Sequence, residues 1–430
     1  MNNDTIFALS SAPGKSGVAV IRISGENLSK LFKRISNKKK FDNRHAYFIN
    51  LNDNDGELID QCIAIYFNAP YSFTGEDVIE IHTHGSPAVI DKIFDFLRNF
   101  GARMADRGEF SRRAFYNNKM DLADLDGLVE LLDAQTDKQR ISALRSLTGQ
   151  DSIKYTNWRN QMIEISAYAA AILDYDSDDL PVNIDKKILT KTQKLLDEIK
   201  NSVSGFRAVR ALRNGFNIAL IGKTNVGKSS IFNKLVGSNR AIVSSVAGTT
   251  RDIVSMQIDL DGFLVNLSDT AGIRKAKDKI EKIGIERTHN EIANADLIIH
   301  VFNEVPKKIA EDEISVVNKA DLLKSKTNRR VIYTSVKTGA GFDRLLKTIK
   351  QKMHDLMDTT ESKIAINERT YELLNDTITE LTNAITKYDG NYDIFAEYVH
   401  RASDNIGKIL GVITTNEIAD MTFSRLCLGK

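Results

Sequence analysis

The chain has 430 residues, 42% of them hydrophobic, which is enough for two or three domains with ordinary apolar cores. Its formal net charge of +2 excludes a generally basic protein, so contact with nucleic acid would need a local patch. The two cysteines, Cys62 and Cys427, lie far apart, which argues against a disulfide framework and favours a reducing compartment. Without a long apolar run or a targeting segment, we expect no membrane span and a cytoplasmic location.

Residues 1–118 are predicted to form a compact α+β unit. Several short runs are rich in apolar residues, as strands are, and two runs have helical spacing. We expect strands at residues 6–9, 18–23, 46–50, 61–68 and 77–83, and helices at residues 26–33 and 87–99.

Residues 119–212 and 355–430 are predicted to be helical, and residues 213–354 alternate between strand and helix. Glycine is absent between Gly149 and Gly205. Apolar residues recur at helical spacing at Leu125, Leu128, Val129 and Leu132, at Ile163, Ala167, Ala170 and Ala171, and at Leu374, Ile378, Leu381 and Ile385. Because such stripes need partners to bury them, we predict one helical domain with an α/β module inserted into it.

The most informative segment is residues 222–229, which has the pattern G-x-x-x-x-G-K-S/T. It follows a strand-like apolar run and precedes a helical one, as a phosphate-binding loop does. Its N–H groups and the N-terminus of the following helix would face a phosphate. Lys228 is expected to reach the β- and γ-phosphates, and Ser229 to bind Mg²⁺.

Two later segments indicate which nucleotide binds. Asp269 ends a strand-like run and opens D-x-x-G, so it can support the Mg²⁺ shell while the N–H of Gly272 senses a γ-phosphate. Residues 318–321 form N-K-x-D, in which the Asp321 carboxylate accepts from guanine's ring N–H and exocyclic amine but would repel the ring nitrogen of adenine. Residues 334–337 resemble the last guanine-contacting loop. An ATPase with a coincidental N-K-x-D is the alternative, and the order of all these segments disfavours it.

Further segments make the chain resemble the MnmE (TrmE) family of tRNA-modification GTPases over essentially its whole length. They include residues 12–14, 21–25, 72–77, 84–85, 107–111, 247–252, 283–287 and 423–425, and the terminal C-x-G-K at residues 427–430.

The resemblance implies three kinds of domain: an N-terminal α+β domain like those that bind tetrahydrofolate, an all-α helical domain and an inserted α/β P-loop GTPase domain. It implies that GTP is hydrolysed to GDP. With an MnmG-like FAD protein, as a heterotetramer, such proteins modify carbon 5 of the wobble uridine of certain tRNAs by a carboxymethylaminomethyl-type addition. The N-terminal domain would form a homodimer and hold a 5-formyl-tetrahydrofolate-type donor.

The resemblance also implies the nucleotide contacts. These are Asn225, Val226, Gly227, Lys228, Ser229, Ser230, Ser244, Ser245, Val246, Ala247, Gly248, Thr249, Asp269, Thr270, Ala271, Gly272, Asn318, Lys319, Asp321, Ser335, Val336 and Lys337.

The position after D-x-x-G is Ile273, which cannot orient the attacking water as the glutamine of small GTPases does. No arginine finger is evident, although Arg251 and Arg274 are nearby candidates. The resemblance implies that K⁺ fills this role when the GTPase modules meet face to face. Its ligands would be Asn225 and the carbonyls of Ser244, Val246 and Thr249, with Thr250 on Mg²⁺.

Glu281 matches the catalytic glutamate of the family, and the alternative is a solvated helix carboxylate. Cys427 matches a participant in the tRNA chemistry, and the alternative is an inert thiol, because no base is visible near it in the sequence. The positions that contact folate are matched by Arg22, Glu80, Lys119 and Lys430, each of which alone would read as a surface charge.

Two rival functions remain open: an Era- or Der-like regulatory GTPase in ribosome assembly, and a folate carrier gated by GTP. The inserted GTPase module and the terminal C-x-G-K favour tRNA modification. One departure from the family pattern lies at residues 303–313, where the helix between two strands of the GTPase module is expected to be truncated while both strands remain.

Overall fold

The computed structural model describes residues 4–174, 183–238, 240–242, 254–269, 293–323, 328–358, 367–413 and 429. The chain divides into two compact units. The first comprises Met1–Val129, Ser146–Asn160 and Ser403–Lys430, and the second comprises Glu130–Arg145 and Gln161–Ala402. The domain limits expected from the sequence remain a prediction.

A six-stranded sheet in the order β3-β4-β5-β2-β1-β6 belongs to the first unit. Neighbouring strands are antiparallel, except that β1 and β6 run parallel. The strands are β1 (Ile6–Leu9), β2 (Ser16–Gly25), β3 (Ala46–Asn52), β4 (Leu58–Phe67), β5 (Asp77–Gly85) and β6 (Arg103–Met104).

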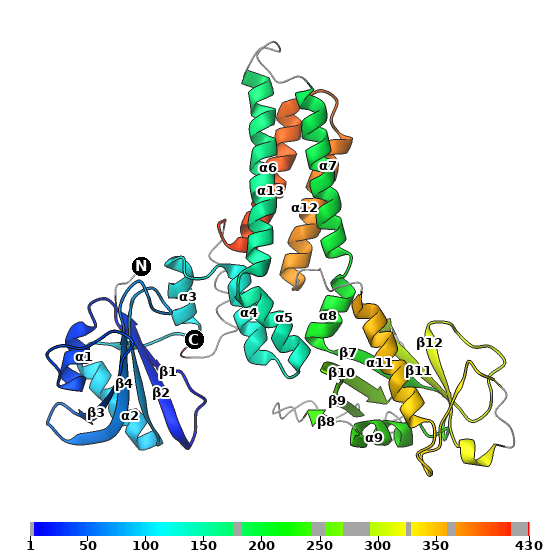
Figure 1. Ribbon diagram of the computed structural model, residues 1–430, viewed down its shortest axis with the longest axis horizontal. Helices are drawn as coiled ribbons and strands as arrows, with labels where there is room; N and C mark the ends of the chain where they lie inside the picture. The colour runs from blue at the N-terminus through cyan, green and yellow to red at the C-terminus, as the bar shows by residue number, and fades with distance from the viewer. Residues whose placement is uncertain are drawn as a thin grey trace, which may run out of the picture. The chain divides into compact units, whose positions relative to one another are not determined.

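Helices α1 (Ser29–Ser36) and α2 (Pro87–Asn99) cover one face of this sheet (Figure 1). Phe7 of β1 points into the core that they form, and Cys62 is buried in it at 3% exposure. Because side chains alternate along a strand, the neighbours of Phe7 point to the opposite face, where they pack against Phe110. Phe110 belongs to α3 (Glu109–Tyr116), so this short helix lies against that opposite face.

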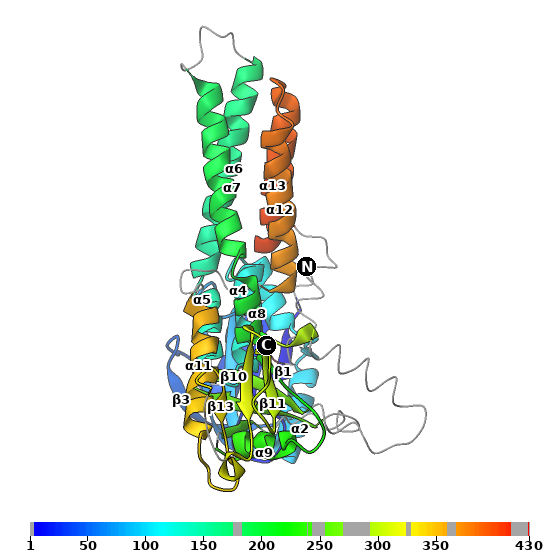
Figure 2. The same cartoon turned by 90° about the vertical axis from the view of Figure 1, so that its right-hand side faces the viewer.

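Seven helices among the described residues make up the helical segments: α4 (Leu122–Asp133), α5 (Asp137–Leu147), α6 (Gln150–Asp174), α7 (Ile184–Val203), α8 (Phe206–Asn214), α12 (Glu368–Thr386) and α13 (Tyr392–Leu410). Figures 1 and 2 show the long parts of α6, α7, α12 and α13 that belong to the second unit running alongside one another. At the start of α12, the Asn367 side chain accepts the Thr370 N–H at 2.7 Å, which caps the helix. Leu374 and Leu381 of the predicted α12 stripe are fully buried, so that stripe is a core face.

A seven-stranded sheet in the order β13-β12-β11-β7-β10-β9-β8 forms the inserted module. Its strands are β7 (Phe216–Ile221), β8 (Arg240–Ile242), β9 (Val254–Leu260), β10 (Phe263–Asp269), β11 (Leu297–Phe302), β12 (Glu313–Val317) and β13 (Ile332–Tyr333). The apolar side chains of α9 (Lys228–Ser238) and α11 (Phe342–Asp358) pack on it. Strand β7 lies between β10 and β11 and runs parallel to both, so the loops that follow these strands meet at one edge of the sheet.

The shortened connection expected from the sequence is present. Residues 303–312 contain no helix, and β11 still pairs with β12 in parallel. The sheet keeps both strands because their pairing depends on the strands themselves rather than on the connection between them.

The structure differs from several of the expectations. Helix α1 begins at Ser29 rather than at residue 26, because Asn27 adopts a left-handed backbone (φ 57°) and Asp77 accepts the Leu28 N–H. Strand β6 and helix α3 were not expected. On α6 the buried side is not the stripe that includes Ile163, which is 46% exposed.

The buried side of α6 carries larger side chains, at Tyr155, Trp158, Met162, Ile165 and Ala169. Their greater area decides which face turns inward, because the alanines of the other stripe bury little surface. Leu132, at the end of the α4 stripe, is 44% exposed rather than buried. None of the helices in the described ranges is long and apolar enough to cross a membrane.

Candidate functional sites

The phosphate-binding loop joins β7 to α9, as its sequence predicts. Lys228 is 5% exposed, and its Nζ donates to the carbonyls of Gly222 at 2.8 Å and Lys223 at 2.9 Å. The ammonium group therefore lies against the loop that would surround a phosphate. Ser229 Oγ donates to Asp269 Oδ2 at 2.5 Å, so the two expected Mg²⁺-supporting oxygens lie together although forty residues separate them.

The N-K-x-D segment is tied to this loop. Asn318 Nδ2 donates to the Val226 carbonyl at 3.0 Å, and Lys319 Nζ donates to the Asn225 carbonyl at 3.1 Å. A Cβ atom on Gly227 would lie 2.2 Å from Asn318 Nδ2, and Gly227 has a φ of +94°, so only glycine fits this contact. The structure thus brings the expected phosphate and guanine loops together.

Asp321 points to the last expected guanine loop. Ser335 Oγ donates to Asp321 Oδ1 at 2.6 Å, and this hydrogen bond holds the pKa of Asp321 below its ordinary value. The carboxylate is therefore ionised near neutral pH, as acceptance from a guanine requires. Val336 packs on the module's core, and Lys337 and Ser230 are exposed.

Many of the expected site residues lie outside the described part of the chain. They are Ser244, Ser245, Val246, Ala247, Gly248, Thr249, Thr250, Thr270, Ala271, Gly272, Glu281, Cys427 and Lys430.

In the first unit, the expected folate residues Arg22 and Glu80 are cross-strand neighbours on β2 and β5. Arg22 Nε donates to Glu80 Oε1 at 3.0 Å, and Arg22 Nη1 donates to the carbonyl of Gly429 at 3.2 Å. Ser10 Oγ donates to the same carbonyl at 3.0 Å. A Cβ on Gly429 would lie 2.4 Å from the Leu9 carbonyl oxygen, which explains a glycine in the terminal C-x-G-K.

Among the described residues, Lys119 forms no hydrogen bond or ion pair with Arg22 or Glu80. Its Nζ donates to the Pro70 carbonyl at 3.1 Å, on the connection between β4 and β5. Phe73, on the same connection, has its ring centroid 5.2 Å from Arg22 Cζ, so Lys119 and Arg22 both contact this connection but at different residues.

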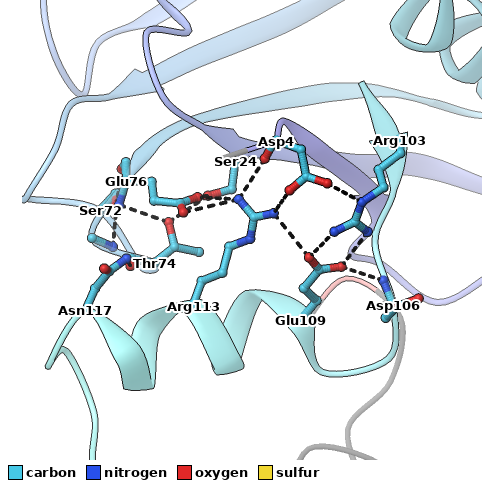
Figure 3. Close-up of polar contacts among 11 residues, drawn as sticks. Asp4, Ser24, Ser72, Thr74, Glu76, Arg103, Asp106, Glu109, Arg113 and Asn117 are labelled. Carbon is cyan, nitrogen blue, oxygen red and sulfur yellow. Dashed lines mark hydrogen bonds and ion pairs between the residues drawn. The ribbon is translucent and has the colours of Figure 1, made fainter. Parts of the chain in front are cut away.

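A polar network beside this site was not assigned a role from the sequence, although its segments were noted as family features. Figure 3 shows Arg113 of α3 pointing toward Asp4, Glu76 and Glu109. Arg113 Nη1 lies 3.0 Å from Glu76 Oε2, and Arg113 Nη2 lies 2.9 Å from Asp4 Oδ1 and 3.1 Å from Glu109 Oε1. Arg103 also pairs with Glu109, at 2.6 Å, and with Asp4, at 2.5 Å.

Burial alone would raise the pKa of the Glu109 and Asp4 carboxyl groups. Hydrogen bonds and charge attraction, chiefly from Arg103 and also from Arg113, outweigh burial, so both pKa values lie below their ordinary range. Asp4 and Glu109 are therefore ionised at neutral pH.

The fold and the linked loops define a P-loop GTPase module within a larger protein. The family model described as the GTP-binding protein TrmE N-terminus matches residues 5–119, and that of the MnmE helical domain matches residues 122–427. The tRNA modification GTPase MnmE of Bartonella tribocorum is 37% identical over 438 residues, covering 99% of this chain and 100% of the relative. The protein of the same name from Brucella anthropi is 37% identical over 436 residues, covering 99% and 98%.

The chain therefore belongs to the MnmE family of tRNA modification GTPases. Among solved structures, the G domain of the T. maritima FeoB iron transporter aligns with 33% of this chain and 98% of its own length, at 26% identity and a TM-score of 0.24.

Proposed function

We propose that this protein is a K⁺-activated GTPase that converts GTP to GDP and takes part in modifying carbon 5 of the wobble uridine of tRNA in the cytoplasm. In this proposal it acts as a homodimer, with an MnmG-like FAD protein in a heterotetramer, and uses a 5-formyl-tetrahydrofolate-type donor. The observation that carries the nucleotide part is the joining of the N-K-x-D loop to the phosphate loop through Asn318 and Val226.

The described residues fit the expected metal ions to different extents. Ser229 Oγ and Asp269 Oδ2 are adjacent oxygens of the kind that Mg²⁺ prefers, with Ser229 as the direct ligand. Asn225 is exposed in the phosphate loop and can contribute a side-chain oxygen to K⁺. These cations would neutralise charge that develops on the phosphates.

The residues of this chain then divide the work on the nucleotide. Lys228 would exchange its two loop carbonyls for phosphate oxygens, Asp321 would accept the guanine N–H groups, and Glu281 would orient water.

For the folate-type ligand, the supporting observation is that Arg22, Glu80 and Gly429 meet although they are far apart in sequence. Each oxygen of a carboxylate can accept two hydrogen bonds, so Glu80 can accept pterin N–H groups while it keeps Arg22. In the sequence, Lys430 follows Gly429 directly and Cys427 precedes it by two residues. We propose Cys427 as a participant in the tRNA chemistry.

Mass spectrometry of wobble nucleosides from a strain lacking the protein tests the proposed function. We expect loss of the carbon-5 modification and its return with the wild-type chain but not with Lys228→Ala. Unchanged nucleosides in the deletion strain would refute tRNA modification and would leave the ribosome-assembly or folate-carrier functions. Equal GTP turnover in KCl and NaCl would refute the K⁺ assignment independently.

A further inference from the structure

Arg22 lies within reach of two aromatic rings that belong to different elements. Its Cζ is 5.2 Å from the centroid of Phe73, on the connection between β4 and β5, and 5.8 Å from that of Phe110, on α3. Attraction between a guanidinium and aromatic rings restricts how the cation can turn. We call the Phe73 and Phe110 rings the two walls of Arg22. The distance between these walls influences the orientation of the Arg22 guanidinium toward Glu80, which it contacts at 2.9 Å.

Two hydrogen-bonded contacts tie the walls to each other (Figure 3). Arg113, three residues after Phe110 on α3, binds both carboxylate oxygens of Glu76, at 3.2 and 3.0 Å, three residues after Phe73. Asn117 Nδ2 donates to the Thr74 carbonyl at 2.7 Å. These contacts connect α3 with the segment 72–76 on either side of the aromatic pair.

The segment 72–76 is also tied to the strand that carries Arg22. Ser24, two residues after Arg22 on β2, donates from Oγ to Glu76 Oε2 at 2.7 Å and hydrogen-bonds Thr74 Oγ1 at 2.7 Å. The Glu76 carboxylate is thus hydrogen-bonded to both β2 and α3. A displacement of Arg113 would therefore move Glu76 and, through Ser24, act on the strand that carries Arg22.

Apolar packing joins the two rings on the inner side, where Phe73 packs against the cluster that contains Phe110, whereas the side facing the network is polar. A cavity of about 540 Å³ adjoins the network and is lined by Asp4, Glu76, Arg103, Glu109, Arg113 and Asn117, among others. Arg113 itself is 8% exposed on its side chain. A buried ion pair of this kind adds little stability over an apolar replacement, whereas the planar guanidinium imposes a definite geometry on its carboxylates.

We propose that Arg113 is a positioning residue for the Arg22–Glu80 site: through Glu76, and together with Asn117, it sets the distance between the Phe73 and Phe110 walls. This inference rests on the proposed function, in which the Arg22–Glu80 pair receives a folate-type ligand. Arg113 itself does not touch that pair.

Two variants and one matched control test the inference. Arg113→Lys keeps the buried charge but loses the forked geometry, and Asn117→Ala removes the second contact from an exposed, uncharged residue at little cost in stability. Arg103→Lys makes the same chemical change as Arg113→Lys, in a residue that pairs with Glu109, at the start of α3, and with Asp4. Among the described residues, its hydrogen bonds go to α3, Asp4 and Met104 and not to the segment 72–76, so it does not join α3 to that segment.

The affinity of the purified full-length chain for 5-formyl-tetrahydrofolate is measured by calorimetry, beside its thermal unfolding. We expect about a tenfold loss of affinity for Arg113→Lys, about threefold for Asn117→Ala, and less than twofold for Arg103→Lys. Wild-type affinity in both Arg113→Lys and Asn117→Ala would overturn the inference. A loss of affinity in Arg103→Lys equal to that in Arg113→Lys would also overturn it.

Amide hydrogen exchange without ligand separates this result from the proposed function. If the wild-type chain binds no folate, the folate part of the proposed function fails, and exchange alone decides the positioning role. We expect Arg113→Lys to speed exchange in residues 72–76 and 110–114 together, while Arg103→Lys does not. Unchanged exchange in those segments would refute the tie between the walls.

Discussion

Asn318→Ala tests directly whether the guanine loop supports the phosphate loop. Asn318 is 3% exposed, its Nδ2 donates to the Val226 carbonyl at 3.0 Å, and it accepts weakly from Thr334 Oγ1 at 3.4 Å. Truncation removes the strong bond and leaves the carbonyl of Val226, a residue 3% exposed, without this donor. An unpaired buried carbonyl costs about 1–3 kcal/mol, so we expect the free energy of unfolding of the GTPase module to fall by about 2 kcal/mol.

Amide hydrogen exchange of β12 and α9 measures this loss within the module, independently of the other parts of the chain. A loss of about 2 kcal/mol corresponds to roughly thirtyfold faster exchange, and GDP affinity should fall with it because the loop is no longer held in place. Asn318→Asp should cost more, since a carboxylate would face the carbonyl. Lys319→Ala removes an exposed contact and should change exchange less than threefold. If Asn318→Ala matched Lys319→Ala in both exchange and affinity, the proposed support would be refuted.

Three further predictions concern the first unit. Ser10→Ala removes the hydrogen bond to the Gly429 carbonyl and should therefore speed alkylation of Cys427. Ser11 accepts the Val20 N–H instead, so Ser11→Ala should leave the alkylation rate unchanged. Equal alkylation rates in the two variants would contradict a role for the Ser10–Gly429 hydrogen bond. Burial raises the pKa of the Cys62 thiol to about 12, so Cys62 should stay unmodified when alkylation at pH 8 is followed by mass spectrometry. Burial, then a neighbouring carboxylate, raises the pKa of Asp124 to about 6 from 3.8, so the folded chain holds a proton that the unfolded chain releases, and stability falls as pH rises from about 4 to 6. Asp124→Asn should therefore unfold at a higher temperature than wild type at pH 8 but not at pH 4. The same difference in unfolding temperature between variant and wild type at both pH values would refute this.

The nucleotide-binding parts could be predicted from the sequence because their information is local. The phosphate loop needs a short stretch of backbone with glycine and lysine at fixed spacing, and the guanine loop needs four consecutive residues, so each can be recognised before any fold is known. Helix α2 also matched its predicted limits, since Pro87 marks its first turn and its apolar residues repeat at helical spacing. The shortened connection at residues 303–312 follows from chain length alone.

Other features depended on which distant segments pack together. Trp158 and Met162, rather than the stripe through Ile163, face inward on α6, because the volume available beside a helix is set by its neighbours. Arg113 reads as one more surface charge in the sequence. Glu109 is its neighbour on the same helix, but only packing of α3 on the sheet adds the carboxylates of Asp4 and Glu76. Likewise, Gly429 meets Ser10 across 419 residues of chain. The sequence by itself thus determined the phosphate and guanine loops, whose chemistry is carried by consecutive residues, whereas the Arg22–Glu80–Gly429 site and its supporting network were decided by tertiary packing, which alone brings such separated side chains within hydrogen-bonding distance.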